Sequence, residues 1–118
     1  MPWTRWRKLA EGKRWFDDSF DYDGPACYEL ATSGPRGGDM EIHYVGETKN
    51  ERLRMESYGR NGSHLSKIIR ARLRRGWTLY YRAWRYSRKA EAKKMQDRRL
   101  QQFEYDWNVH GNSSDDDS

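Results

Sequence analysis

The chain has 118 residues, which is enough for one domain with a single modest core. Only 35% of its residues are hydrophobic, but 14% are aromatic, which argues against disorder and lets Tyr and Trp supply much of the core. No apolar run approaches the roughly 20 residues that span a bilayer, and the basic N-terminus lacks the apolar segment of a secretory signal. The single cysteine, Cys27, excludes an internal disulfide and a cysteine-cluster zinc site. We therefore expect an intracellular protein without membrane contact.

The net charge of +5 is unevenly distributed along the chain. Thirteen Lys or Arg residues lie between Lys67 and Arg99, against only Glu91 and Asp97. The chain ends in the acidic sequence GNSSDDDS, so we expect residues 110–118 to be a disordered tail and the folded part to be more basic than the total. A concentrated basic face favours a polyanionic partner, with nucleic acid first; the alternative is an ordinary solvated helix surface.

Residues 1–23 are expected to form a basic, Trp-rich arm followed by an acidic linker, with the folded domain at 24–109. The segment WTRWRKLAEGKRWF, residues 3–16, combines three tryptophans with basic side chains. It would either contact a phosphate backbone or pack over one end of the core, and the sequence favours neither. The following DDSFDYDG is acidic and rich in turn residues.

The next pattern is that of a β-hairpin. The segments ACYELAT (26–32) and MEIHYVG (40–46) have strand-like content, and the intervening SGPRGGD is rich in turn residues. A helix should begin near Thr48, because Thr48 and Glu51 have the spacing of a capping box, and it should stop at Gly59.

A second helix is expected from Ser63 to Arg75, ending at Gly76. The aromatic segment WTLYYRAWRY (77–86) predicts the third strand, and Ser87 can cap the last helix. The predicted fold is α/β, with a small, three-stranded, mostly antiparallel sheet covered by helices. The elements follow the order strand–strand–helix–helix–strand–helix.

The last helix contains an oddly placed amide at Gln96. Gln96 lies within an apolar stripe at helical spacing that should face the core, formed by Ala92, Met95, Leu100 and Phe103. A buried amide costs free energy unless a partner satisfies it. Gln96 is therefore either a helix-edge residue with its head group in solvent or an inward-facing residue with a function.

Four residues of the hairpin and the first helix suggest a site for a phosphodiester. Arg54 and Tyr58 are four residues apart and should share one helix face. The hairpin can also bring Tyr28 and Tyr44 together. Arginine binds phosphate through two hydrogen bonds, and phenols donate, accept or, when activated, take protons. Each tyrosine taken singly is more simply a core or sheet residue, so the prediction depends on the joint spacing.

From about Gly24 to Asn108 the chain resembles the GIY-YIG nuclease family of homing, restriction, phage and UvrC-type endonuclease domains. The most specific segment is YVGETKNERLRMESY, which combines the second tyrosine motif, the helical arginine and an aromatic residue one turn later. In the first motif, Ala26 and Cys27 replace the usual Gly and Ile. The family's downstream A-x-x-φ-E helix and terminal asparagine are matched by Ala92, Met95, Gln96 and Asn108.

The resemblance places Gln96 where the family has the glutamate that binds a divalent cation. It implies Mg²⁺ or Mn²⁺ as the cofactor, but an amide lacks the charge that makes carboxylates good ligands for hard cations. This chain should therefore bind metal poorly and cleave slowly or not at all. Gln96 would be either an engineered Glu→Gln that holds substrate uncut or the residue of a naturally inactive member, and the intact remainder of the site favours engineering.

The resemblance also implies roles for the other residues in DNA hydrolysis. Tyr28 would act as general base, helped by nearby positive charge because an unperturbed phenol has a pKa near 10. Arg54 would hold the scissile phosphate and stabilise developing charge. Tyr44 and Tyr58 would orient the water and the base, and Asn108 would support the site from the last helix. The expected location is the bacterial cytoplasm or a phage-infected cell, and the alternatives for the source are a phage, a restriction system and a mobile element.

Double-stranded DNA is the expected partner. Specificity would come from the N-terminal arm, from the basic helix or from a homodimer on two strands. His64 would either touch phosphate or be an ordinary surface histidine. The residues assigned to DNA contact are Lys49, Arg60, His64, Lys67, Arg70, Arg74, Arg5 and Arg7. The alternative function is a non-catalytic nucleic-acid-binding module, whereas a basic protein-interaction domain leaves the tyrosine–arginine set unexplained.

Overall fold

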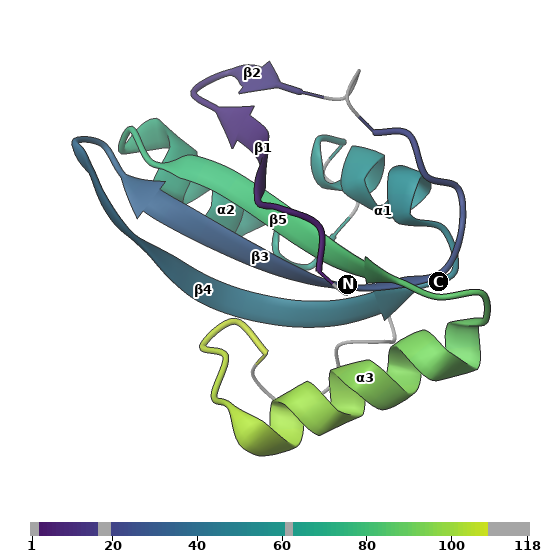
Figure 1. Ribbon diagram of the computed structural model, residues 1–118. Helices are drawn as coiled ribbons and strands as arrows, with labels where there is room; N and C mark the ends of the chain where they lie inside the picture. Colours follow the sequence, from purple (N-terminus) through teal and green to yellow (C-terminus); the bar gives the residue numbers. More distant parts are fainter. Residues whose placement is uncertain (1–2, 17–19, 61–62, 109–118) are drawn as a thin grey trace.

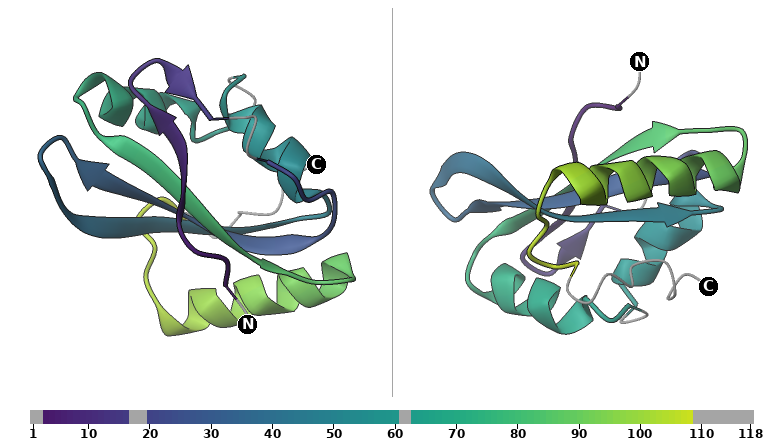
Figure 2. Two further views of the ribbon diagram at one scale, coloured as in Figure 1. Left: turned by 45° about the horizontal axis from the view of Figure 1, so that its top comes forward. Right: turned by 90° about the horizontal axis from the view of Figure 1, so that it is seen from below.

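The computed structural model describes residues 3–16, 20–60 and 63–108. The described strands form one antiparallel sheet in the order β2-β1-β5-β3-β4, with α1 and α2 over one face and α3 over the other (Figure 1, Figure 2). In chain order the elements are β1 (Arg7–Glu11), β2 (Arg14–Trp15), β3 (Ala26–Gly34), β4 (Gly37–Thr48), α1 (Glu51–Tyr58), α2 (Ser66–Arg74), β5 (Thr78–Arg85) and α3 (Lys89–Gln102).

The α/β class and the antiparallel sheet agree with the prediction, but the number of strands does not. The described sheet has five strands instead of three, because β1 and β2 come from the segment predicted as an arm. β1 pairs with β5, where Ala10 lies opposite Leu79. Leu9 and Ala10 are fully buried, so this short strand gains apolar burial as well as backbone hydrogen bonds.

The tryptophans of this N-terminal segment pack on the fold, as the second of the two alternatives predicted. Trp3 lies edge-on against Trp84, with 5.5 Å between the ring centroids. The Arg82 guanidinium lies 4.4 Å from the Trp3 ring centroid and 4.7 Å from that of Trp6. Trp15 is partly buried against the core on the α1–α2 face. Aromatic burial and cation–π contacts hold the segment to the sheet.

The central hairpin forms where it was predicted, with longer strands. β3 and β4 pair from Ala26 opposite Thr48 to Gly34 opposite Gly37. Gly37 has a φ of +80°, a conformation that glycine adopts without steric cost in a tight turn. This pairing places Tyr28, of the first tyrosine motif, opposite Gly46, of the second.

Two predicted helix caps are wrong. Asn50, not Thr48, caps α1, since the Asn50 side chain accepts a hydrogen bond of 3.0 Å from the Leu53 N–H. Thr48 is the last residue of β4 and its hydroxyl accepts from the Asn50 N–H at 3.1 Å. At α3 the N-cap position is Arg88 rather than Ser87, and no side chain caps that end.

Apolar side chains are buried on both faces of the described sheet. The three site tyrosines belong to the core on the α1–α2 face. On the other face, α3 contributes Ala92 and Met95, as the apolar stripe predicted. Phe103 was predicted to face this core but is 50% exposed, because α3 ends at Gln102 and Phe103 follows in an extended conformation. Among the helices described here, none is long and apolar enough to cross a membrane.

Candidate active site

The candidate site begins with three tyrosines on the α1–α2 face of the sheet. The Tyr28 and Tyr58 hydroxyl oxygens are 2.6 Å apart and share a hydrogen bond. The Tyr28 ring centroid lies 6.1 Å from that of Tyr44 and 6.3 Å from that of Tyr58. All three side chains are at most 1% exposed. The fold therefore brings together three residues that are distant in the sequence.

Gly46 makes room for the Tyr28 ring. The two residues lie opposite each other across β3 and β4. A Cβ atom on Gly46 would lie 2.6 Å from the Tyr28 hydroxyl oxygen and 2.7 Å from Cζ, which is closer than non-bonded atoms pack. The ring cannot easily move aside, because its hydroxyl is bonded to Tyr58. Glycine at this position therefore permits the ring to cross the β4 backbone.

We expect Gly46→Ala to destabilise the protein by about 1–3 kcal/mol, the usual cost of adding a methyl group to a packed site. Thermal unfolding measures this loss. Gly34→Ala is the control, since a Cβ there would make only ordinary contacts, the nearest at 3.6 Å to the Gly37 carbonyl oxygen. Equal melting temperatures for both variants would show that the Tyr28 ring is not confined by Gly46.

Arg54 comes from the same helix as Tyr58, one turn earlier, as the spacing predicted. Its side chain is mostly buried, with 7% of the residue exposed. The Arg54 charge acts on Tyr28, since it lowers the pKa of that phenol. His64 lies at the surface beside these residues, with its ring edge-on to Tyr44 and 6.1 Å between centroids. The site is thus a buried tyrosine–arginine cluster with an exposed histidine next to it.

Burial sets the protonation state of Tyr28. Loss of solvent raises the pKa of Tyr28 well above its ordinary value of 10, the Tyr58 and Tyr44 phenols raise it further, and Arg54 opposes them. The neutral phenol is therefore favoured, which is opposite to what a general base needs near neutral pH. Additional positive charge has to reach Tyr28 before it can take a proton.

Gln96 is buried, with 1% of the residue exposed. The interpretation of Gln96 as a helix-edge residue with its head group in solvent is therefore wrong. Its helix, α3, packs against the face of the sheet opposite α1 and α2 (Figure 1), whereas the three tyrosines belong to the core on the α1–α2 face. Gln96 thus lies in the layer on the α3 side of β3 and β4, and β4 is the strand that carries Tyr44.

The residues of the predicted site do not fit a resident divalent cation. Within the described ranges, no three His, Cys, Asp or Glu side chains are grouped so that they could hold a metal ion. The predicted site supplies phenols, a guanidinium and two carboxamides, whereas Mg²⁺ is usually held by carboxylates, phosphate oxygens and water. The Asn108 carboxamide is moreover hydrogen-bonded to the protein backbone.

Asn108 is hydrogen-bonded to the backbone of β4. Its Oδ1 accepts a hydrogen bond of 2.8 Å from the Val45 N–H, and its Nδ2 donates one of 2.9 Å to the Val45 carbonyl oxygen. Asn108 was predicted to act from the last helix, but α3 ends at Gln102 and Asn108 lies in the segment that follows. Because Val45 is adjacent to Tyr44, this pair of bonds fixes the edge strand where it carries the site tyrosine.

A set of contacts that was not predicted holds this C-terminal segment to β4. His43 Nδ1 lies 2.9 Å from Asp106 Oδ1, and its Nε2 lies 2.8 Å from Thr32 Oγ1. The His43 ring stacks on the Trp107 ring, with 4.3 Å between the centroids. The backbone N–H of Trp107 donates a hydrogen bond of 2.9 Å to the His43 carbonyl oxygen. These partners are far apart in the sequence, so no local spacing indicated them.

A second feature that was not predicted is a buried carboxylate, Glu29, which follows Tyr28 in the sequence. Glu29 is 0% exposed. Its Oε1 accepts from Arg82 Nε at 2.7 Å, and its Oε2 accepts from Arg99 at 2.9 Å and from the Tyr105 hydroxyl at 2.6 Å. These bonds connect β5, α3 and the segment after α3 to β3. A glutamate within the apolar segment ACYELAT was the available signal, because a buried charge requires partners.

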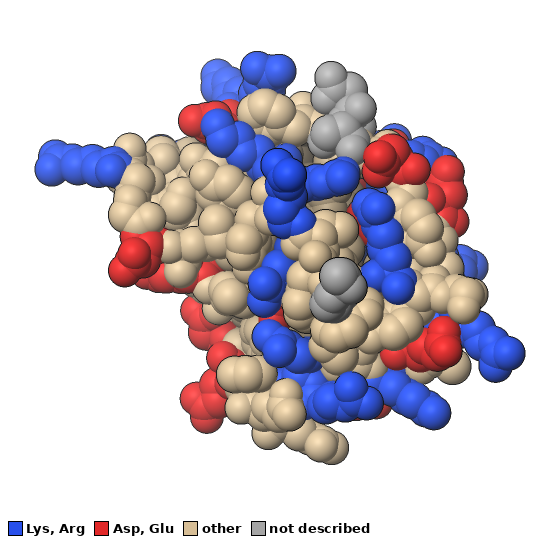
Figure 3. Space-filling model, in the orientation of Figure 1, with Lys and Arg blue, Asp and Glu red and all other residues tan. Residues whose placement is uncertain are grey.

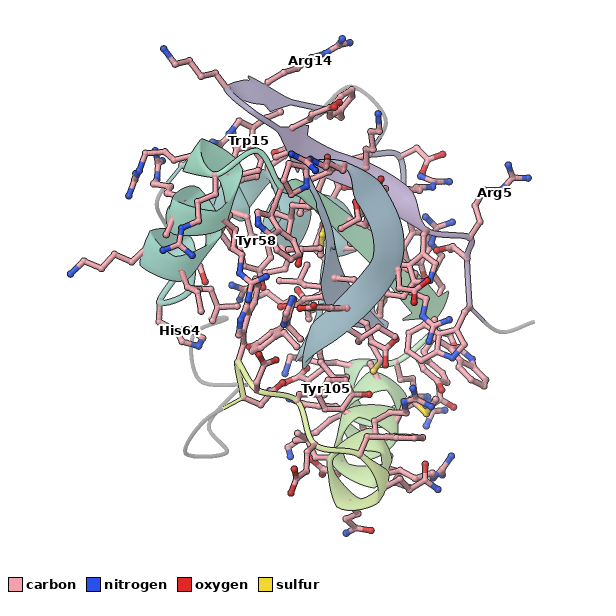
Figure 4. The ribbon with its side chains drawn as sticks, turned by 90° about the vertical axis from the view of Figure 1, so that its left-hand side faces the viewer. Arg5, Arg14, Trp15, Tyr58, His64 and Tyr105 are labelled. Carbon is pink, nitrogen blue, oxygen red and sulfur yellow. The ribbon has the colours of Figure 1, made fainter. Side chains whose placement is uncertain are left out.

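The residues assigned to DNA contact are divided between two sides of the molecule. Lys67, Arg70 and Arg74 lie on α2 at positions that share one helix face, and Lys49, Arg60 and His64 are exposed. Arg5 projects from the side opposite His64 (Figure 4). Arg7 pairs with Asp21 at 3.5 Å. No single surface therefore presents all eight residues.

In Figure 3, Lys and Arg atoms gather along the middle of the face shown, with acidic atoms toward its sides. Independently of that view, several arginines are paired with buried carboxylates. Arg82 and Arg99 are bonded to Glu29, and Arg85 makes two hydrogen bonds of 2.9 Å to Glu51. These arginines hold the fold together as well as contributing positive charge.

The fold is an α/β domain with a buried tyrosine–arginine cluster on one face of its sheet. The chain matches the family described as GIY-YIG domain-containing protein over residues 25–117, which is most of its length. The protein therefore belongs to the GIY-YIG domain family, and this membership points to a nuclease-type hydrolase. Comparisons with curated proteins and with solved structures found no significant match.

Proposed function

We propose that the protein is a GIY-YIG DNA endonuclease that binds duplex DNA and is impaired in cleavage because Gln96 replaces the metal-binding glutamate. The observation that carries this proposal is the clustering of Tyr28, Tyr44, Tyr58 and Arg54 within a chain of the GIY-YIG family. A guanidinium beside phenols suits a phosphodiester, because it pairs with phosphate while a phenol handles the proton.

The chain's own residues have separate tasks in this proposal. Arg54 holds the scissile phosphate and stabilises the charge that develops on it. Once added positive charge has stabilised its phenolate form, Tyr28 takes a proton from the attacking water and becomes a neutral phenol, and Tyr58 orients Tyr28 through the bond of 2.6 Å between their hydroxyls. Asn108 keeps Tyr44 in position through Val45. In intact members of the family a divalent cation at the glutamate position would supply the further positive charge.

A specific observation also supports the alternative, a non-catalytic nucleic-acid-binding module. Gln96 is fully buried, and the predicted site contains no carboxylate at the family's metal position. If Gln96 is native, the basic surface would bind DNA without cutting it. A homodimer on two strands, in either case, would place two such domains on one duplex.

Both versions of the proposal predict duplex binding that weakens with salt. Each phosphate neutralised contributes about −0.9 to the slope of log K against log salt concentration, so Lys67→Ala should make that slope shallower by about 0.9. Fluorescence anisotropy with a labelled duplex measures it. Lys94→Ala is the matched control, since Lys94 is exposed on α3 and was not assigned to DNA contact. Absence of any binding at low salt would remove the nucleic-acid proposal altogether.

A further inference from the structure

A cavity of about 500 Å³ lies between the turn joining β1 to β2 and one side of α2. Its volume is within the range of small-molecule sites, about 300–1,000 Å³. Its lining is cationic and apolar, and none of these described residues is acidic. The lining residues are Gly12, Lys13, Trp15, Arg70, Leu73 and Arg74.

The cavity contains a cation with an unsatisfied group. The Nε of Arg70 is buried and finds no hydrogen-bond partner among the described residues. Arg70 lines the cavity, so an anion bound there would pair with its guanidinium group. Lys13 and Arg74 are both exposed at the same cavity, so they can add charge around such an anion.

Trp15 provides the flat apolar wall of the cavity. Its indole packs close to Gly59, where a Cβ atom would lie 3.3 Å from Trp15 Cδ2. Gly59 directly follows Tyr58, so the wall adjoins the helix that carries the site residues Arg54 and Tyr58. In Figure 4, Trp15 lies between Arg14 and Tyr58, on the same side of the molecule as His64.

We propose that this cavity binds an unpaired nucleotide of a DNA strand, with its base against Trp15 and its phosphate against Arg70, Arg74 and Lys13. Aromatic side chains stack on bases of any sequence, and guanidinium groups pair with phosphate. A strand suits the site better than a free nucleotide, because Lys67 continues the row of cations along α2 beyond the cavity. This inference rests on the proposed function and adds a preference for distorted or single-stranded DNA next to the cleavage site.

The test compares two labelled duplexes that differ only in one unpaired thymidine, by fluorescence anisotropy. We expect the protein to bind the duplex with the unpaired nucleotide about tenfold more tightly, because stacking of one base on an aromatic side chain contributes an effect of this size. Trp15→Leu should abolish this preference while paired-duplex binding persists. Since Trp15 also packs against the core, Lys13→Glu provides a second variant at an exposed position, and it should reduce the preference. Lys94→Glu, with the same charge change on exposed α3, should retain it.

The outcomes separate this inference from the proposed function. Failure to bind either duplex would overturn both. Equal binding to the paired and unpaired duplexes, or an unchanged preference in both pocket variants, would overturn the pocket assignment alone. A deoxynucleoside monophosphate is added as competitor to identify the source of the ligand. If it abolishes the preference at concentrations that leave paired-duplex binding unchanged, the pocket takes free nucleotides and the assignment to a DNA strand is wrong.

Discussion

Gln96→Glu should convert a protein that binds duplex DNA but cuts it little into a nuclease that depends on Mg²⁺ or Mn²⁺. The change replaces one NH₂ group by an oxygen and adds one negative charge at nearly constant volume. Position 96 is 1% exposed, so the new carboxylate would be buried and in need of a positive partner. The restored carboxylate would hold a divalent cation, and that cation would supply positive charge of the kind that the raised pKa of Tyr28 calls for.

A plasmid-nicking assay measures this gain. The restored variant should nick supercoiled DNA in Mg²⁺ and lose the activity with a chelator, whereas the parent should leave the supercoiled band intact. Gln101→Glu is the matched control, because it makes the same substitution at an exposed position of α3. An intact supercoiled band from Gln96→Glu at every metal concentration would support the non-catalytic binding module instead.

Stability provides a readout that does not require cleavage. Without metal, Gln96→Glu should melt at a lower temperature than the parent, because burying a charged carboxylate costs more free energy than burying a neutral amide. A cation that binds the native state raises stability with its concentration, so added Mg²⁺ should restore the melting temperature of Gln96→Glu but not of Gln101→Glu. If Mg²⁺ shifts neither variant, position 96 does not contribute to a metal site.

The features that could be predicted from the sequence are those set by local spacing. The four-residue separation of Arg54 and Tyr58 places both on α1, and the turn-rich segment between 33 and 39 predicts the hairpin that pairs β3 with β4. The apolar stripe on the last helix correctly predicts burial of Ala92 and Met95. Its failure at Phe103 reflects the helix end, since one residue beyond α3 the periodicity no longer determines which side faces the core.

The features that could not be predicted depend on contacts between distant segments. Lys8, Leu9 and Ala10 have no strand-like alternation, and β1 forms because β5 offers a free edge and a place to bury Leu9. Asn108 matches the family's terminal asparagine, but its role as a partner of Val45 depends on a contact 63 residues away in the chain. The pattern placed Gln96 inside the core stripe, yet only the packing of α3 against the sheet decides that it is buried.

These differences bear on how the site is built. The tyrosines and the arginine of the predicted site come from β3, β4 and α1 on one face. Gln96 lies on α3 over the other face, and Asn108, in the segment after α3, is bonded to the edge strand β4. Position 96 and the tyrosine cluster are therefore separate parts, which can fail separately. A protein that has lost the carboxylate can keep the cluster of Tyr28, Tyr58 and Arg54 intact, and restoring the carboxylate makes their contributions measurable.

In the Gln96→Glu background, Arg54→Ala should reduce the cleavage rate about 10²–10³-fold, the usual effect of removing one preorganised donor that stabilises developing charge. Arg54→Lys should recover only part of the rate, because an ammonium group keeps the charge without the paired geometry of a guanidinium. Arg54 is 7% exposed, so truncation also removes packing, and thermal unfolding of both variants measures that separately. The lysine variant, with most of the packing retained, should melt close to its parent and still cleave slowly. If Arg54→Ala cleaves at the parental rate, Arg54 does not hold the scissile phosphate and the assignment of the site is wrong.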